Sequence, residues 1–395
     1  MPQPVIVAGA RTPIGKLLGA LSSLSAPELG GIAIRAALER AGISGEQVDS
    51  VIFGNVVQAG VGPNPARLAA AQGGVPLSVP AVTLNKLCLS GLTAIAQAAL
   101  QVASGYSEIV VAGGMESMSG APYLVPGARG GLKYGAGTFA DALDQDALTC
   151  GFDGLSMGAA TERYQGPLGI TREDQDTFAA ASHAKAATAI KEGRLADEIV
   201  AVTIKGRKSD VVVDEDEGVR PGTTAESLGK LKAAFAAGGT ITAGSASQLS
   251  DGACAVVVMS KERAQSLGLP YLAEVGAYGT VAGPDPSLLH QPARAIQDAL
   301  ARDGALGLGD LDLVEINEAF AGVSLASSRQ LGIPAEKLNV NGGAIALGHP
   351  VGMSGARVVL TLALELARRG GGTGAAALCG GGGQGDALIV RVPVR

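Results

Sequence analysis

The stretch AALERAG at residues 36–42, followed by VDSVIFGN at residues 48–55, decides the fold because its pattern occurs a second time. The first part is typical of a helix that ends at a glycine, and the second is typical of an apolar strand. Far along the chain, DALARDG at residues 298–304 is followed by LDLVEIN at residues 311–317. The order helix, glycine, loop, apolar strand and asparagine therefore recurs, which indicates an internal duplication.

A second pair of segments extends the duplication. CLSG at residues 88–91 opens an Ala/Leu-rich segment that leads to the strand-like IVVA at residues 109–112. GMSG at residues 352–355 opens a similar segment that leads to the strand-like AAAL at residues 375–378. This alternation predicts an α/β fold of two related halves, each with a mostly parallel sheet covered by helices. The alternative is chance similarity in a chain rich in Ala and Gly.

The segment between the halves differs from both of them. It begins with loops rich in Gly and Pro and continues with a charged helix, which Thr171 is expected to cap with Asp174 three residues later. That helix is expected to end near Gly193. We therefore predict an N-terminal domain at residues 1–120, completed by residues 250–270, an inserted loop domain at residues 121–249, and a C-terminal domain at residues 271–395.

The composition excludes several classes of protein. The 30 Lys and Arg against 36 Asp and Glu do not favour a nucleic-acid binder. With three His and no CxxC pair, no metal site is expected, and the four Cys suit reduced thiols in the cytoplasm. No signal peptide or membrane-spanning stretch is recognisable, so we expect a soluble protein with no membrane partner. The only acidic run, residues 214–217, is expected in a solvated loop.

Cys88 is the first candidate for chemistry. It lies between loop residues and a helix predicted to continue to about Ala103. Unpaired N–H groups and the helix dipole favour a thiolate at such a position, and the thiolate is the nucleophilic form of cysteine. The alternative is a buried structural thiol.

Histidine is the natural base for such a nucleophile because it titrates near neutral pH. Gly348 and Pro350 confine His349 to a constrained loop before the second repeat's helix, which makes it the best candidate. The alternative is a structural loop histidine. His183 is expected to face solvent on the charged helix, and His290 is expected to be structural.

Two further segments place polar groups at strand ends. Cys379 is followed by a run of glycines, which leave room for a ligand and offer N–H groups to an oxyanion; the alternative is a plain hairpin turn. Asn317 and Glu318 close an apolar strand, where parallel sheets place ligands. The alternative is that Asn317 caps the next helix.

Together these segments resemble the thiolase family over essentially the full length of the chain. The resemblance rests on the nucleophile segment around Cys88, Asn-Glu-Ala-Phe at Asn317, Gly-His-Pro at His349 and Cys-x-Gly at Cys379. It implies a layered αβαβα fold made of two duplicated halves with an inserted loop domain. It also implies a ping-pong acyltransferase of lipid metabolism, a homodimer or homotetramer, that uses acyl-CoA and coenzyme A as substrates and needs no other cofactor.

The resemblance also implies a role for each site residue. His349 would take the thiol proton from Cys88, and Cys379 would exchange a proton with the α-carbon of acetyl-CoA. His349 and a water held by Asn317 would bind the enolate oxygen. The backbone N–H groups of Cys88 and Gly381 would form a second oxyanion hole.

Two residues of the loop domain match positions that contact the coenzyme in the family. Arg220 would lie beside the nucleotide end, and Ser247 would contact the pantetheine. The chain departs from the family at two other positions. Leu89 follows the nucleophile where many thiolases have Gly, so the resemblance does not define the floor of the acyl pocket. Ser156 stands where many short-chain members have His, so the resemblance does not define the preferred chain length.

The leading hypothesis is an acetyl-CoA C-acetyltransferase, which condenses two acetyl-CoA to acetoacetyl-CoA and CoA. The alternative is a 3-ketoacyl-CoA thiolase of fatty-acid β-oxidation. A non-catalytic acyl-CoA-binding protein of the same fold is disfavoured because no catalytic residue of the family is missing. A decarboxylating ketosynthase is disfavoured because such enzymes usually carry a second His where this chain has Cys379.

Overall fold

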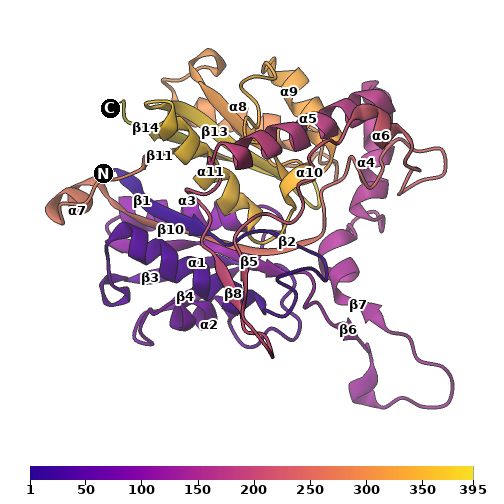
Figure 1. Ribbon diagram of the computed structural model, residues 1–395, viewed down its shortest axis with the longest axis horizontal. Helices are drawn as coiled ribbons and strands as arrows, with labels where there is room; N and C mark the ends of the chain where they lie inside the picture. Colours follow the sequence, from indigo (N-terminus) through magenta and orange to yellow (C-terminus); the bar gives the residue numbers. More distant parts are fainter. Residues whose placement is uncertain (395) are drawn as a thin grey trace.

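The computed structural model describes residues 1–394, which form a mixed sheet covered and divided by helices (Figure 1). Nine strands follow one another across the sheet in the order β4-β3-β5-β10-β1-β11-β14-β13-β12, and β2 pairs with β10. The strands are β1 (Pro4–Arg11), β2 (Gly15–Lys16), β3 (Ser50–Gly54), β4 (Ala81–Leu84), β5 (Ile109–Ser117), β10 (Ser250–Ser260), β11 (Ala273–Ala282), β12 (Leu313–Ile316), β13 (Gly372–Gly380) and β14 (Gln384–Val392).

The strand order repeats between the two halves of the chain. The first half contributes β4-β3-β5-β10-β1, and the second contributes β12-β13-β14-β11 in the matching order. In the second half, Leu338 forms an isolated parallel bridge to Val314, at the position that β4 occupies in the first half. The halves join where Val5 and Ile6 of β1 pair with β11. The duplication predicted from the sequence is confirmed.

Helices form three layers, and the two sheet halves lie between them (Figure 1). The outer helices are α1 (Ala26–Ala41) and α2 (Pro65–Gln72) on one side and α8 (Gln291–Asp303) and α9 (Ala321–Leu331) on the other, and the central helices are α3 (Ser90–Ala103) and α11 (Ser354–Arg368). Alternate side chains of β5 show the layering: Val110 joins the central core, and Val111 joins the core beneath α1. The αβαβα architecture is therefore confirmed.

The prediction of mostly parallel sheets is wrong. Only β3–β4, β3–β5 and β12–β13 are parallel, and the remaining neighbours are antiparallel. In the first half, β10 enters the sheet after the long insertion and runs against both β1 and β5. In the second half, the glycines between β13 and β14 make a turn too short for a parallel crossover, so these strands form a hairpin.

The insertion between β5 and β10 consists of short hairpins and helices. Thr171 and Asp174 form the predicted capping box. Its elements are β6 (Tyr123–Leu124), β7 (Ala140–Asp141), α4 (Met157–Gln165), α5 (Arg172–Lys191), β8 (Val202–Ile204), β9 (Val211–Val213) and α6 (Ala225–Gly229), and the remaining short helices of the chain are α7 (Lys261–Ser266) and α10 (Ala344–Leu347). Within residues 1–394, no helix combines the length and apolar character needed to cross a bilayer.

The acidic run is only in part the solvated loop expected: Asp214 and Glu215 are exposed, whereas the next two residues have partners in the protein. Asp216 is buried, and its carboxylate pairs with the fully buried Arg11 at 2.6 Å. Glu217 accepts the backbone N–H groups of Lys16 and Ala20. The run therefore attaches the insertion to the N-terminal strand segment.

Candidate active site

A strained loop presents Cys88 just before α3. Leu87 adopts a left-handed conformation with φ 53°, which is unfavourable for a residue with a side chain. Ser90 holds the loop in this shape: its hydroxyl accepts the N–H of Lys86 at 2.8 Å and donates to the carbonyl of Leu87 at 2.6 Å. The side-chain oxygen of Asn85 accepts the backbone N–H of Leu87 at 3.0 Å. The position of the Cys88 thiol is thereby fixed before any ligand binds.

The environment of Cys88 keeps its thiol protonated at rest. Burial raises the pKa of Cys88 to about 11, the backbone N–H groups of Cys88 and Gly381 act in the opposite direction, and the carboxyl of Glu116 raises the pKa further. The helix start alone therefore does not yield the thiolate that the sequence position suggests. The thiol needs a base to become a nucleophile.

His349 is placed to be that base. Its ring is fixed through Nδ1, which lies 2.6 Å from the hydroxyl of Ser354. Its backbone N–H is shared between the carbonyl of Gln248 and the hydroxyl of Ser250. Burial and, to a smaller extent, the charge of Arg357 lower the pKa of His349 to about 3. At neutral pH the imidazole is therefore uncharged and able to accept a proton.

Asn317 follows β12 directly and lies against the ring of His349. Its Nδ2 is 3.4 Å from Nε2 and 3.5 Å from Nδ1 of that ring. Arg357 donates to its Oδ1 at 3.4 Å and pairs with Glu315 at 2.6 Å. Asn317 does not line the cavity described below, and it does not cap α9, because Phe320 is the residue before that helix. The side-chain amide of Asn317 is thus held beside the ring of His349, as expected of two groups that act together.

Cys379 stands near the end of β13, and the glycines after it form the hairpin turn to β14. The two interpretations of this segment are therefore compatible. Burial and the neighbouring Cys88 raise the pKa of the Cys379 thiol. A Cβ atom at Gly381 would lie 2.6 Å from Cε of Met157 and 2.7 Å from a methyl carbon of Leu87, so a larger residue there would displace its neighbours. Glycine leaves the backbone close enough for its N–H to face Cys88.

One cavity of about 510 Å³ joins these groups. The second half contributes His349, Cys379 and Gly381 to its wall, and the first half contributes Cys88. The insertion supplies much of the remaining wall, including Ser156, Met157, Gly158, Arg220, Phe235 and Ser247. A ligand that extends from the two thiols to Arg220 would therefore contact all three parts of the chain.

The residues expected to bind the coenzyme both line this cavity. The backbone N–H of Ser247 donates to the carbonyl of Ala319 at 3.0 Å, and the backbone N–H of Arg220 donates to Nδ1 of His183 at 3.2 Å. The expectation that His183 faces solvent is wrong, since its side chain is buried in α5. Burial and the charge of Arg220 lower the pKa of His183 to about 4, so the ring accepts this bond in its neutral form.

The two departures from the family pattern occupy different places. Leu89 is fully buried and does not line the cavity; a Cβ atom at Gly380 would lie 2.7 Å from its Cγ. Leu89 therefore supports the hairpin from behind and is not part of the cavity floor. Ser156 does line the cavity, and its hydroxyl also caps α4 by accepting the N–H of Ala159 at 3.2 Å.

Sequence reasoning missed two buried residues that support the site. Ser354, which fixes His349, occupies the same place in its repeat as Ser90, and the matching Ser-Gly pairs could have identified it. Glu116 receives four N–H donors from the segment after β3 and from Gly352, three residues after His349. The only sequence signal for Glu116 is a charge inside an otherwise apolar strand.

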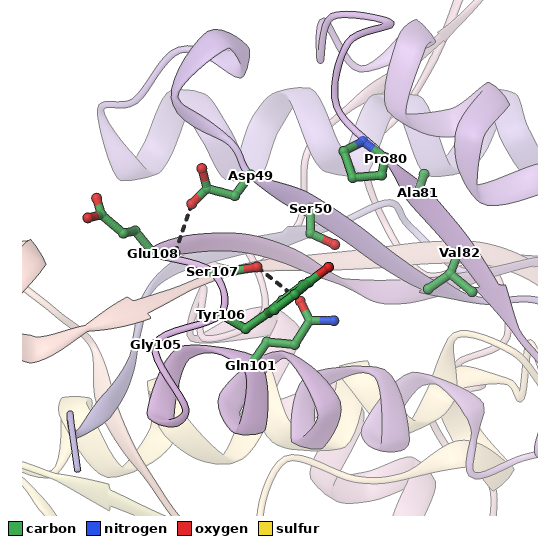
Figure 2. A pocket seen from close by; sticks show the side chains of 10 residues that line it. All are labelled: Asp49, Ser50, Pro80, Ala81, Val82, Gln101, Gly105, Tyr106, Ser107 and Glu108. Carbon is green, nitrogen blue, oxygen red and sulfur yellow. Dashed lines mark hydrogen bonds between the residues drawn. The ribbon is translucent and has the colours of Figure 1, made fainter.

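A second cavity, of about 580 Å³, lies away from the thiols, between the starts of β3 and β4 and the segment that joins α3 to β5 (Figure 2). Asp49 and Glu108 are its ionisable carboxylates, and its wall contains no Cys or His. The Asp49 carboxylate is engaged, because it accepts the backbone N–H groups of Glu108 and Ile109 at 2.8 Å each. The groups suited to covalent chemistry are therefore those around Cys88.

Comparison with known proteins agrees with this geometry. The thiolase N-terminal domain family matches residues 4–262, and the thiolase C-terminal domain family matches residues 269–392. A probable acetyl-CoA acetyltransferase of Mycolicibacterium smegmatis is 56% identical over 388 residues, which are 98% of this chain and 100% of the relative. An acetyl-CoA acetyltransferase of Pseudomonas aeruginosa is 50% identical over 392 residues, 99% of each chain.

The fold is shared with a solved structure as well. The crystal structure of the Bacillus anthracis acetyl-CoA acetyltransferase superposes with a TM-score of 0.96 at 41% identity and covers 100% of this chain and 99% of that one. The matched domains together span almost the whole sequence, and the duplicated halves, the insertion and the paired thiols are all present. This chain belongs to the thiolase family.

Proposed function

We propose that this protein is an acetyl-CoA C-acetyltransferase of lipid metabolism, which reversibly condenses two acetyl-CoA to acetoacetyl-CoA and CoA. The observation that carries the proposal is the meeting of Cys88, His349 and Cys379 in one cavity that extends to Arg220. The names of the relatives from M. smegmatis and P. aeruginosa support the same reaction.

The first half-reaction transfers an acetyl group to Cys88. His349 takes the thiol proton, and the sulfur attacks the carbonyl carbon of acetyl-CoA. The oxyanion that forms would be held by the backbone N–H groups of Cys88 and Gly381, the two groups that lower the pKa of the Cys88 thiol. The tetrahedral intermediate collapses, the thiolate of coenzyme A leaves, and His349 returns the proton to it.

The second half-reaction forms the carbon–carbon bond. Cys379 gives its thiol proton to His349, and the resulting thiolate removes a proton from the α-carbon of a second acetyl-CoA. Protonated His349 and a water held by Asn317 stabilise the enolate oxygen, consistent with the contact between these two side chains. The enolate carbon attacks the acetyl carbonyl on Cys88, the Cys88 sulfur leaves and takes the proton from His349, and acetoacetyl-CoA is released.

The insertion would hold the coenzyme. We assign residues 121–249 as the coenzyme A-binding loop domain, between an N-terminal domain of residues 1–120 with 250–270 and a C-terminal domain of residues 271–395. Arg220 would bind the nucleotide end, and Ser247 would contact the pantetheine. The mechanism needs no metal and no cofactor besides the coenzyme A thioesters.

The shape of the cavity beside the thiols favours a short acyl group. Met157 reaches the hairpin at Gly381, and Phe235 packs against Phe320 edge-to-face at a ring-centroid distance of 5.8 Å. These large side chains line the cavity and pack in the same cluster as Cys379. The arrangement supports acetyl transfer over the longer 3-ketoacyl substrates of β-oxidation.

We further propose a homodimer or homotetramer in the cytoplasm. Within residues 1–394, β4 pairs only with β3, so its other edge is open. Val82 of β4 is 48% exposed and lines the same cavity as the exposed Tyr106 (Figure 2). A second copy would cover an edge that is otherwise prone to uncontrolled pairing. The free thiols of Cys88 and Cys379 also need a reducing compartment to remain active. Light scattering during size-exclusion chromatography measures the mass of the assembly.

The proposed reaction is tested with purified protein and acetyl-CoA. We expect acetoacetyl-CoA and free CoA as products, and mass spectrometry of quenched protein should find an acetyl group on the peptide that contains Cys88. The Cys88→Ala variant is the control and should give neither product nor label. Label on Cys379 alone would reverse the assignment of the two thiols, and absence of acetoacetyl-CoA in the wild type would refute the reaction.

A further inference from the structure

Lys86, two residues before the nucleophile, crosses from the first half of the chain to the second. Its ammonium group donates to Oδ1 of Asp386 at 2.7 Å, to the hydroxyl of Thr280 at 3.0 Å and to the hydroxyl of Tyr278 at 3.2 Å. These acceptors lie on β11 and β14. All three ammonium protons therefore have partners, which fixes the direction of the side chain.

Asp386 connects this contact to the hairpin that carries Cys379 and Gly381. It lies on β14 opposite Leu378, the residue before Cys379, and its side chain is fully buried. Its second oxygen accepts the hydroxyl of Thr93 in α3 at 2.7 Å. One carboxylate thus holds both the nucleophile loop and the helix that follows it.

The network lies behind the site and not in it, since neither Lys86 nor Asp386 lines the cavity. It joins two segments that lie against each other, since a Cβ atom at Gly381 would lie 2.7 Å from a methyl carbon of Leu87. These segments carry the two proposed oxyanion donors, the N–H groups of Cys88 and Gly381, which both lower the pKa of the Cys88 thiol. An oxyanion hole works only when its donors are held at hydrogen-bond distance from a single oxygen position. The separation of the two segments therefore controls acyl transfer.

We propose that Lys86 and Asp386 are positioning residues that hold the Cys88 loop and the Gly381 hairpin at the separation acyl transfer requires. The proposal rests on the proposed function for the identity of the reaction, and it adds an ion pair across the duplication to the groups that reaction needs. The proposal also concerns the position of the Gly381 N–H relative to the Cys88 sulfur, and this position does not depend on the identity of the substrate.

The first test is the Lys86→Met variant. We expect kcat for acetyl exchange between acetyl-CoA and CoA to fall by about 10- to 100-fold, because loss of an oxyanion donor costs about 100- to 1000-fold and here the donor is displaced, not removed. KM for acetyl-CoA should change less than about twofold. Lys86→Arg, which can still reach Asp386, should recover most of the activity.

Lys261→Met is the matched control. Lys261, the first residue of α7 directly after β10, pairs with Glu274 of β11 at 2.8 Å. This pair also joins the two halves, but it lies at the end of β10 that is far from Ser250 and the site. It should keep the exchange activity of the wild type. An equal loss in Lys261→Met and Lys86→Met would mean that any ion pair between the halves has this effect and would overturn the proposal.

The double variant Lys86→Met with Asp386→Asn separates charge from position. It removes one positive and one negative charge. If Lys86 acted through its charge alone, the loss of acetyl exchange seen in Lys86→Met should therefore disappear in the double variant. If the pair acts by position, the double variant stays as slow as Lys86→Met. Recovery of wild-type exchange in the double variant would overturn the proposal.

The pH profile of Cys88 alkylation by iodoacetamide is the readout that does not depend on the reaction. Displacing the Gly381 N–H removes a group that favours the thiolate of Cys88. The pH profile of alkylation should therefore lie at higher pH in the folded double variant than in the wild type. A wild type that makes no acetoacetyl-CoA would refute the proposed function while leaving this comparison intact. An unshifted profile would overturn the positioning role, whatever the activity.

Discussion

Gly91 and Gly355 face each other across the duplication, each in the first turn of its central helix. A Cβ atom at Gly91 would lie 2.6 Å from the backbone nitrogen of Ala356, and one at Gly355 would lie 2.3 Å from the backbone nitrogen of Leu92. No side chain fits there, because backbone cannot move aside as a flexible side chain can. The loops that carry Cys88 and His349 end at these two helix starts, so the contact sets how closely nucleophile and base approach.

Gly91→Ala is expected to separate α3 from α11. Overpacking of this kind costs about 1–3 kcal/mol of stability, and the displaced loops should lower acetyl exchange about tenfold or more. Urea unfolding and exchange assays measure the two effects. Gly309→Ala is the control, because nothing lies within 4 Å of an added Cβ there. If Gly91→Ala is as stable and active as this control, the close helix contact is not required.

The pKa of Cys88 gives a pH prediction. Because burial raises it to about 11, the thiolate fraction should rise about tenfold per pH unit from pH 7 to pH 10. Alkylation of the free enzyme by iodoacetamide, followed by mass spectrometry of the Cys88 peptide, should increase in parallel. A rate that levels off by pH 8 would show that the thiolate is already formed in the resting enzyme.

Glu116 is expected to stabilise the junction of the halves behind the site. Its oxygens accept from the side chain of Asn55 and from the backbone N–H groups of Val56, Val57 and Gly352, at 2.8 to 3.1 Å. In Glu116→Gln, the amide NH₂ would face two of these donors, which should cost about 1–3 kcal/mol in urea unfolding at pH 9, where the wild-type carboxyl is ionised.

The same variant tests the protonation state of Glu116. Burial raises the pKa of Glu116 to about 8, and the N–H groups of Val56, Val57 and Gly352 oppose that rise. A raised carboxyl pKa means that the folded state binds a proton more tightly than the unfolded state, so wild-type stability should fall as pH rises from about 4.5 to 8 through this group. A Gln variant as stable as the wild type at pH 7 would show that the folded carboxyl is protonated there.

The duplication, the insertion and the candidate site residues could be predicted because each depends on residues close together in sequence. The helix-glycine-strand pattern is local, and so are the segments around Cys88 and His349. Strand direction was not predictable from these patterns. An apolar strand such as β10 has the same composition whichever way it runs, and its direction depends on a connection of more than a hundred residues.

Buried charge was the other part that sequence reasoning could not place. His183 and the acidic run were expected at the surface because charged segments usually are. The ion pairs that allow charged groups to be buried join residues far apart in the sequence. Arg11 and Asp216 are 205 residues apart, and Lys86 and Asp386 are 300 residues apart. Only the folded chain shows that such groups have partners.

Arg220→Ala is expected to weaken binding of the coenzyme and leave the chemistry intact. Arg220 lines the cavity wall that the insertion supplies, away from the thiols in sequence and held by His183. KM for acetyl-CoA should rise about tenfold, the scale of a lost charged hydrogen bond of 1.5–3 kcal/mol. The rate with a short thioester that lacks the nucleotide should stay within about twofold. Equal losses for both substrates would place Arg220 in folding or chemistry instead.

Cys379→Ser is expected to separate the two half-reactions. Acetylation of Cys88 requires a nucleophile, a base and an oxyanion hole, and Cys88, His349 and the backbone N–H groups supply these. The carbon–carbon bond also requires a proton to leave the α-carbon of the second acetyl-CoA, and Cys379 is the remaining titratable group among the proposed catalytic residues. Burial raises the pKa of the Cys379 thiol, so its thiolate, once formed, binds a proton strongly.

Serine keeps the shape of this side chain but has a pKa far above that of a thiol, which removes a usable base near neutral pH. Condensation should therefore fall about 100-fold or more, whereas acetyl exchange between acetyl-CoA and CoA should fall much less. Cys150→Ser is the control, since Cys150 is a buried thiol outside the cavity wall and should alter neither rate beyond its effect on stability. Collapse of exchange together with condensation would show that Cys379 is also needed to acetylate Cys88, and the division of labour between the two thiols would be wrong.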